Sequence, residues 1–262
     1  MQTILKLLLL VLGAWAGTAA AQTGSEAPAR PTIVLVHGAF AESSSWNAVA
    51  GELLEDRYPV IAVANPLRSV KGDADYLRSI LSSIPGEVIL VGHSYAGIVM
   101  TEAAAGAPNV KSLVYVAGYA PDVGESAAAI SRRFPEGTLG PAIGPPVAQS
   151  DGSKDLYIDQ GKFWAQFAAD VPQAEAARMA ATQRPILEAA LAEPVSVAAW
   201  KTKPSWFIYG ARDKNIPRSA QAFMARRASS RETIEVPGAS HVVMISHPEK
   251  VAAMIKRAST SR

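Results

Sequence analysis

The chain has 262 residues, of which 49% are hydrophobic and 18% charged, enough for one α/β domain with a sizeable buried core. Its formal net charge of +2 is small and its basic residues are dispersed, so neither a nucleic-acid-binding nor an anionic-membrane-binding surface is expected. The absence of cysteine excludes disulfides, a thiol nucleophile, thiolate metal sites and lipid attachment through cysteine.

The N-terminus has the order of a secretory signal peptide. Lys6 precedes an apolar run, which ends in the small residues Ala19–Ala21. The run is shorter than the roughly 18 to 20 residues that a membrane-spanning helix needs. We therefore predict a signal peptide over residues 1–21 with cleavage after Ala21, a secreted or periplasmic mature protein, and a flexible leader over residues 22–31.

Six short apolar runs indicate strands that are buried on both faces of a parallel sheet. They span residues 32–36, 60–64, 88–91, 112–117, 205–209 and 233–236. Segments with apolar residues at helical spacing separate most of these runs, which predicts βαβ units, and Asp73 is expected to cap one of the helices. The predicted fold class is α/β, with a mainly parallel sheet of about six strands and helices on both faces.

The middle of the chain has a different pattern. Between residues 121 and 204 no strand-like run appears, and a Gly/Pro-rich passage is followed by helical segments. We predict a helical cap inserted at 121–204 into a core formed by residues 32–120 and 205–262. The aromatic residues of the cap are expected to pack in its interior or to form an apolar ceiling over a substrate. They are Phe134, Tyr157, Phe163, Trp164, Phe167 and Trp200.

The stretch Val88–Gly97 has the pattern of a strand, a sharp turn and a helix. Ser94 lies at the turn, with the small residues Gly92 and Ala96 two positions before and after it, as in the Gly-x-Ser-x-Gly nucleophile elbow. Ala96 occupies the second small position of that pattern, and Gly97 follows it. An ordinary capping serine would fit the same local pattern, so the rest of the chain must distinguish the two readings.

Several polar residues follow the predicted strands, at the sheet edge where ligands bind in open parallel sheets. They are His37, Ser94, Asp122, Asp213 and His241. A serine nucleophile needs a base to take its proton, and the base needs a carboxylate to fix its tautomer. Ser94, His241 and Asp213 can supply these three roles, and Asp122 is the alternative carboxylate.

Four motifs together resemble the α/β-hydrolase superfamily over about residues 32–258. They are His37-Gly38, the elbow Gly92–Gly97, Gly210-x-x-Asp-x-x-Ile-Pro217 and His241-x-x-x-x-Ser-x-Pro248. Within the superfamily, the chain is similar to small bacterial serine hydrolases related to the plant methylesterases and hydroxynitrile lyases. The resemblance implies an α/β-hydrolase fold and a carboxylic ester hydrolase.

The resemblance also implies roles for individual residues. Ser94 would be the nucleophile, His241 the general base and Asp213 the carboxylate that orients it. The backbone N–H groups of Ala39 and Tyr95 would form the oxyanion hole. Phe40 is a second candidate for that hole, and we also expect it to contact the substrate together with Trp164 and Trp200 of the cap.

Further expectations concern the reaction and the binding partners. The related lyases carry lysine after the catalytic histidine, but this chain has Val242, so lyase activity is not expected. His37 is expected to order the loop after its strand, and His93 to be a packed, hydrogen-bonded side chain. No metal or cofactor is expected. The predicted partner is a small-molecule ester, and the predicted state is a monomer or weak homodimer.

Two other functions remain open on the sequence. A triad-bearing protein can act as a ligand receptor with slow turnover. The same triad can also cleave a C–C bond or carry out perhydrolysis.

Overall fold

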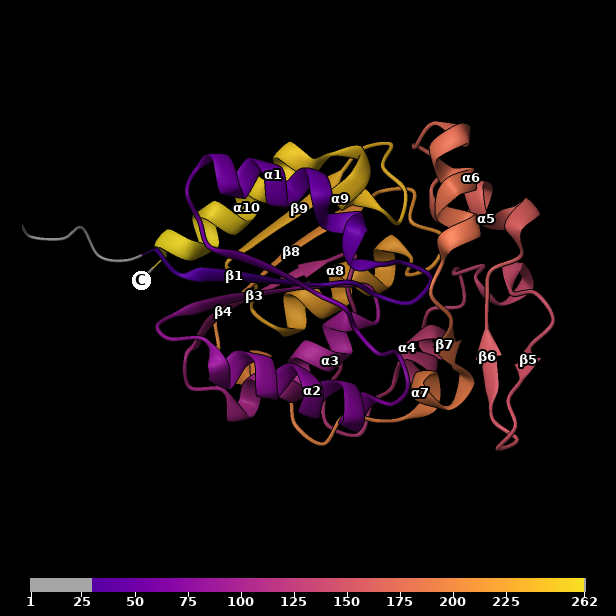
Figure 1. Ribbon diagram of the computed structural model, residues 1–262, viewed down its shortest axis with the longest axis horizontal. Helices are drawn as coiled ribbons and strands as arrows, with labels where there is room; N and C mark the ends of the chain where they lie inside the picture. Colours follow the sequence, from indigo (N-terminus) through magenta and orange to yellow (C-terminus); the bar gives the residue numbers. More distant parts are fainter. Residues whose placement is uncertain (1–29, 262) are drawn as a thin grey trace, which may run out of the picture.

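The computed structural model describes residues 30–261 (Figure 1). The predicted signal peptide and most of the predicted leader therefore lie outside the described residues. Within residues 30–261, no helix is long and apolar enough to cross a membrane.

The core is a six-stranded parallel sheet in the order β2-β1-β3-β4-β8-β9 (Figure 1). Its strands are β1 (Thr32–Val36), β2 (Val60–Val63), β3 (Val88–His93), β4 (Val110–Val116), β8 (Ser205–Gly210) and β9 (Glu232–Val236). The four central strands, β1, β3, β4 and β8, are almost completely buried because helices cover both faces of the sheet. The prediction of a parallel α/β sheet of about six strands is confirmed.

Helices pack on both faces of this sheet. In Figure 1, α1 (Asn47–Glu55) and α10 (Pro248–Thr260) lie on one face, and α2 (Val70–Ser83) and α3 (Ala96–Ala103) lie on the other. The other helical elements of the core are η1 (Ser43–Trp46), η2 (Ala104–Gly106), α8 (Arg218–Arg227) and α9 (Val243–Ser246).

The start of α2 differs from the prediction. The N-cap is Ser69, whose Oγ accepts the Gly72 N–H at 3.0 Å. Asp73 lies inside the helix instead, where it is buried and accepts a hydrogen bond from the Tyr95 hydroxyl at 3.2 Å. The predicted cap residue is therefore a link between α2 and the turn after β3.

A long segment, residues 117–204, connects the neighbouring strands β4 and β8, and we call it the insertion. It stands at the end of the sheet toward which the parallel strands run (Figure 1). Its elements are α4 (Ala127–Arg133), η3 (Gly140–Ala142), β5 (Val147–Ala148), β6 (Lys154–Leu156), α5 (Gln160–Phe167), α6 (Gln173–Thr182), β7 (Ile186–Leu187), α7 (Glu188–Ala192) and η4 (Ala199–Lys201). Besides the predicted helices it contains a small antiparallel sheet, β5-β6-β7, whose strands of two or three residues are too short to give a periodic pattern.

The insertion is tied to the core by hydrogen bonds of two glutamates, Glu193 and Glu102. The Glu193 carboxylate accepts the first two N–H groups of α2, from Val70 at 2.7 Å and Lys71 at 2.9 Å. An anionic side chain is favourable there because the N-terminus of a helix carries a partial positive charge. On α3, the Glu102 carboxylate accepts the Ser196 N–H at 2.8 Å and its hydroxyl at 2.6 Å.

Candidate active site

Ser94 lies on a sharp turn between β3 and α3. Its φ of +54° is in the left-handed region, which is uncommon for a residue other than glycine and persists only where the surroundings enforce it. Its side chain is 8% exposed. The local backbone therefore has the geometry of the predicted nucleophile elbow.

The glycines around this turn explain the departure from the usual motif. A Cβ on Gly97 would lie 2.2 Å from the Tyr119 carbonyl oxygen, whereas Ala96 fits with its side chain fully buried. A Cβ on Gly92 would lie 2.8 Å from Met100 Sδ. The second position that requires glycine in this chain is therefore 97, one residue later than in Gly-x-Ser-x-Gly.

Asp213 and His241 follow β8 and β9 and contact each other in the interior. The His241 Nδ1–H donates to Asp213 Oδ2 at 2.7 Å, and both side chains are fully buried. The other carboxylate oxygen, Oδ1, accepts the N–H groups of Asn215 at 2.8 Å and Ile216 at 3.0 Å. This arrangement assigns the proton to Nδ1 and leaves the lone pair of Nε2 free, since Nε2 makes no hydrogen bond within residues 30–261.

His93, the residue before Ser94, links the elbow to this pair. Its Nε2–H donates to the His241 carbonyl at 3.2 Å, and the two imidazole centroids are 4.7 Å apart. His93 is completely buried, and burial holds the pKa of its imidazole well below the usual range, so the ring is neutral. The structure thus brings Ser94, Asp213 and His241 to the same end of the sheet.

Asp122, the alternative carboxylate, has other partners. Its side chain forms an ion pair with Lys201 and accepts the Val123 N–H at 2.7 Å. The hydrogen bond from Lys201 holds the pKa of Asp122 below its usual range. The carboxylate that contacts His241 is therefore that of Asp213.

The loop after β1 lies directly against the elbow. A Cβ on Gly38 would be 2.6 Å from Ser94 Cβ and 2.7 Å from the His93 carbonyl oxygen, so only glycine allows this approach. The N–H groups of Ala39 and Tyr95 donate to no acceptor in the described part of the chain. The Phe40 N–H, by contrast, donates to the Arg184 carbonyl at 3.0 Å. Of the three candidates for the oxyanion hole, Ala39 and Tyr95 therefore have free donors and Phe40 does not.

His37 orders this loop, as predicted. Its Nδ1–H donates to the Gly38 carbonyl at 2.9 Å, and its Nε2 accepts the Asn65 N–H at 2.9 Å. The Asn65 amide returns a hydrogen bond to the His37 carbonyl at 3.0 Å. Burial lowers the pKa of His37, which keeps Nε2 unprotonated and able to accept.

Known proteins resemble this chain in sequence and in fold. Residues 33–254 match the alpha/beta hydrolase family. The chain belongs to that family. This confirms the resemblance and the predicted α/β-hydrolase fold.

Individual members of the family resemble the chain over most of its length. An alpha/beta hydrolase, nvfD, of Aspergillus novofumigatus is 25% identical over 252 residues, which are 88% of this chain and 97% of the relative. Methylesterase 3 of Arabidopsis thaliana is 25% identical over 254 residues, again 88% and 97%. The crystal structure of polyneuridine aldehyde esterase superposes with a TM-score of 0.76 at 17% identity, over 87% of this chain and 98% of the other.

Aromatic residues of the insertion of this hydrolase pack against His241. Phe167, at the end of α5, packs edge-on to the His241 imidazole with centroids 5.0 Å apart and to Phe40 at 6.3 Å. Phe163, one turn earlier, supports it at 4.9 Å. Both phenylalanines were among the predicted cap aromatics, but neither was among the predicted substrate-binding residues. Their spacing of four residues on one helix was the signal that both face the same way.

The two tryptophans predicted to bind substrate lie elsewhere. The Trp164 ring is 38% exposed, and its Nε1–H donates to the Val171 carbonyl at 3.0 Å. The Trp200 Nε1–H donates to the Pro121 carbonyl at 2.7 Å, and its ring lies beside Arg227. The structure therefore brings Phe40, but neither Trp164 nor Trp200, against the aromatic cluster that covers His241.

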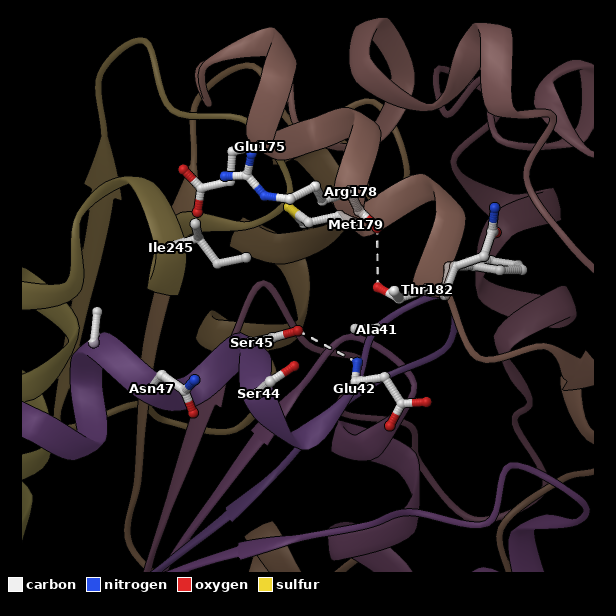
Figure 2. Close-up of a pocket in the computed structure, with 13 residues that line it drawn as sticks. Ala41, Glu42, Ser44, Ser45, Asn47, Glu175, Arg178, Met179, Thr182 and Ile245 are labelled. Carbon is white, nitrogen blue, oxygen red and sulfur yellow. Dashed lines mark hydrogen bonds between the residues drawn. The ribbon is translucent and has the colours of Figure 1, made fainter.

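A groove of about 400 Å³ runs beside the loop that follows β1 (Figure 2). One wall comes from Phe40, the start of η1 and α1, and Ile245 of α9. The other wall is α6, whose Arg178, Met179 and Thr182 lie across from the core residues in Figure 2. Phe40 lines this groove, whereas Ser94 does not.

Metal-binding clusters are absent from the described part of this hydrolase. No group of three or more His, Cys, Asp or Glu side chains within residues 30–261 is arranged to hold a metal ion.

Proposed function

We propose that the protein hydrolyses small or medium carboxylic esters through a Ser94–His241–Asp213 triad and an acyl-enzyme. The observation that carries the proposal is the buried hydrogen bond from His241 to Asp213, next to a serine whose backbone has the elbow geometry. Membership of a hydrolase family and the esterase names of the relatives support the choice of substrate class.

The geometry supports a two-step acyl transfer. His241 Nε2 takes the Ser94 hydroxyl proton as Oγ attacks the ester carbonyl, and Asp213 stabilises the imidazolium that forms. The N–H groups of Ala39 and Tyr95 donate to the carbonyl oxygen as it becomes negative. His241 then returns the proton to the departing alcohol.

The second step restores the enzyme. A water molecule gives a proton to His241 Nε2 as its oxygen attacks the acyl carbon, and the acid leaves as Ser94 recovers its proton. Each proton is thus moved by one imidazole nitrogen, which requires the Nδ1–H tautomer that Asp213 imposes.

The groove beside Phe40 is our candidate for the part of the site that holds the rest of the ester. Its inner end is apolar, with Phe40 and Met179, and its rim carries hydroxyl and charged groups. Since Ser94 is nearly buried, neighbouring side chains must move for an ester to reach it. A contact of Trp164 or Trp200 with the substrate stays a prediction.

Hydrolysis of p-nitrophenyl acetate and butyrate tests the proposal. Ser94→Ala should abolish turnover, whereas Ser82→Ala, an exposed serine of α2, should leave it unchanged. Mass spectrometry after treatment with a fluorophosphonate should place the label on Ser94. Turnover that persists in Ser94→Ala would refute the triad.

A ligand receptor with slow turnover is a second candidate, favoured by the burial of Ser94 and by the packing of Phe167 against His241. It predicts a ligand-dependent rise in melting temperature without ester turnover. Wild-type hydrolysis that depends on Ser94, at a kcat typical of enzymes, about 1 s⁻¹ or more, would exclude it.

Export and assembly state are also proposals. We propose cleavage after Ala21, which the N-terminal sequence of the mature protein would test, and a monomer or weak homodimer, which light scattering would test.

A further inference from the structure

The cap segment after α6 lies against the loop that follows β1. The Arg184 carbonyl accepts the Phe40 N–H at 3.0 Å. The Arg184 guanidinium donates two parallel hydrogen bonds to the Glu42 carboxylate, from Nε to Oε1 and from Nη2 to Oε2, each 3.0 Å long. One cap residue thus holds the loop at two points, which lie one and three residues after Ala39.

The paired geometry makes this contact directional. A bidentate arginine–carboxylate pair fixes the relative orientation of both groups, unlike a single contact between point charges. The Arg184 and Glu42 side chains are 35% and 30% exposed, so the protein shields the pair in part from solvent. The contact therefore restrains the loop as well as attracting it to the cap.

The backbone of the loop requires such a restraint. Phe40 has a φ of +61°, in the left-handed region that an aromatic residue seldom adopts. A strained residue stays in that region only when its surroundings hold it there. The bond from the Phe40 N–H to Arg184 and the Glu42–Arg184 pair are contacts that can do so.

The restraint lies on one side of the candidate oxyanion donor. Before Ala39, the loop is fixed by the hydrogen bonds of His37 with Asn65. After Ala39, it is fixed by Arg184. Between these points lies the Gly38–Ala39 peptide, whose carbonyl accepts the His37 Nδ1–H at 2.9 Å. Release of the second point would leave this planar peptide held on its carbonyl side only, so that the Ala39 N–H could tilt away from Ser94.

The opposite end of α6 is attached independently. The Ser240 hydroxyl, next to His241, donates to the Asp170 carboxylate and lies 3.3 Å from the Phe167 carbonyl. Loss of the Arg184 guanidinium therefore removes one of the contacts at the C-terminal end of α6, where the Arg184 carbonyl still accepts the Phe40 N–H, while Asp170 holds the other end. Glu42 and Gln183, near the first of these contacts, are among the residues that line the groove of Figure 2.

We propose that Arg184 is a positioning residue of the oxyanion hole, which acts from the cap through Glu42 and through its own carbonyl. This rests on the proposed function, because it takes the Ala39 N–H as a donor to the reacting carbonyl. A residue with this role contributes to the transition state more than to ground-state binding.

Arg184→Ala and Glu42→Ala test the proposal in the full-length protein. Each should lower kcat for a p-nitrophenyl ester by about 10- to 100-fold, which is no more than the effect of losing one oxyanion donor. KM should change less than about threefold. The inhibition constant of an alkylboronic acid, whose tetrahedral adduct places an oxyanion in the hole, should rise in parallel. The double variant should be no slower than the slower single one, because the two residues act as a unit.

Arg257→Ala is the matched control. Arg257 makes the same bidentate pair with Glu232, at 2.8 and 3.0 Å, on a different part of the surface. Its loss should lower the melting temperature about as much as the loss of Arg184 but leave kcat unchanged. Arg184→Lys should keep more of kcat than Arg184→Ala, since it retains the positive charge but not the paired geometry.

The outcomes separate this inference from the proposed function. If the wild type shows Ser94-dependent turnover and Arg184→Ala is as fast as Arg257→Ala, the positioning role alone is overturned. A wild type without Ser94-dependent turnover would overturn the proposed function and this inference with it. A loss of kcat with a parallel loss of boronic acid affinity, absent from the control, would support both.

Discussion

Replacement of Asp213 by asparagine removes the negative charge of the candidate triad but keeps the shape of the side chain. One side-chain oxygen of residue 213 faces the N–H groups of Asn215 and Ile216, so an asparagine would keep its oxygen there. Its NH₂ group would then face His241 Nδ1, where the carboxylate accepts at 2.7 Å in the native protein. Nδ1 would have to accept, and the proton would move to Nε2.

An imidazole with its proton on Nε2 cannot take the proton of Ser94. We expect kcat for a p-nitrophenyl ester to fall by about 10⁴-fold, as expected for a triad in the wrong tautomer. Loss of the charge-assisted hydrogen bonds should lower the free energy of unfolding by about 1.5–3 kcal/mol, so the protein should remain folded in a urea titration. The control is Asp122→Asn, which removes a carboxylate paired with Lys201. Asp213→Asn that keeps more than a tenth of the native rate, or Asp122→Asn that loses it, would refute the assignment.

Three further predictions concern the elbow, pH and the cap. Gly97→Ala places a Cβ 2.2 Å from the Tyr119 carbonyl and should cost at least about 1–3 kcal/mol in a denaturant titration; native stability would contradict the close packing. Because burial holds the pKa of His37 below 6.5, the unfolded chain binds the extra proton, so the melting temperature should fall as pH drops below about 6.5; a His37→Asn variant should show a shallower fall, and equal slopes would count against this. Trp200→Phe leaves the Pro121 carbonyl without its donor and should cost about 1–3 kcal/mol while kcat/KM stays within about twofold; a larger kinetic effect would favour the predicted substrate contact.

The sheet and the elbow could be predicted because both leave local patterns. Strands buried on both faces appear as continuous apolar runs, and all six runs became strands of the sheet. The close approach of Gly38 to Ser94 likewise leaves a glycine in the sequence, since no other residue fits there. Ser94, Asp213 and His241 each follow the carboxyl end of a predicted strand, which indicated that they would lie at the same edge of the sheet.

Contacts between distant segments left no comparable pattern. Nothing in the residues near Arg184 indicates that it pairs with Glu42, which lies 142 positions earlier in the chain. Asp73 was predicted as a helix cap because Asp is favoured there, but Ser69 takes that role and Asp73 binds Tyr95. In each case the partner is chosen by the packing of the whole domain, which overrides local preference.

The placement of the insertion between β4 and β8 also bears on how the chain folds. Ser94 belongs to the part of the sheet formed by β1–β4, whereas Asp213 and His241 follow its last two strands, β8 and β9. Strand pairing across so long a connection is slow, because the entropy of closing the loop is lost before the new contacts form. We expect the β1–β4 part to form first, with its serine in place but without a base. Recovery of ester hydrolysis during refolding would then report the docking of β8 and β9, and a lag behind the recovery of secondary structure would measure the time that this step takes.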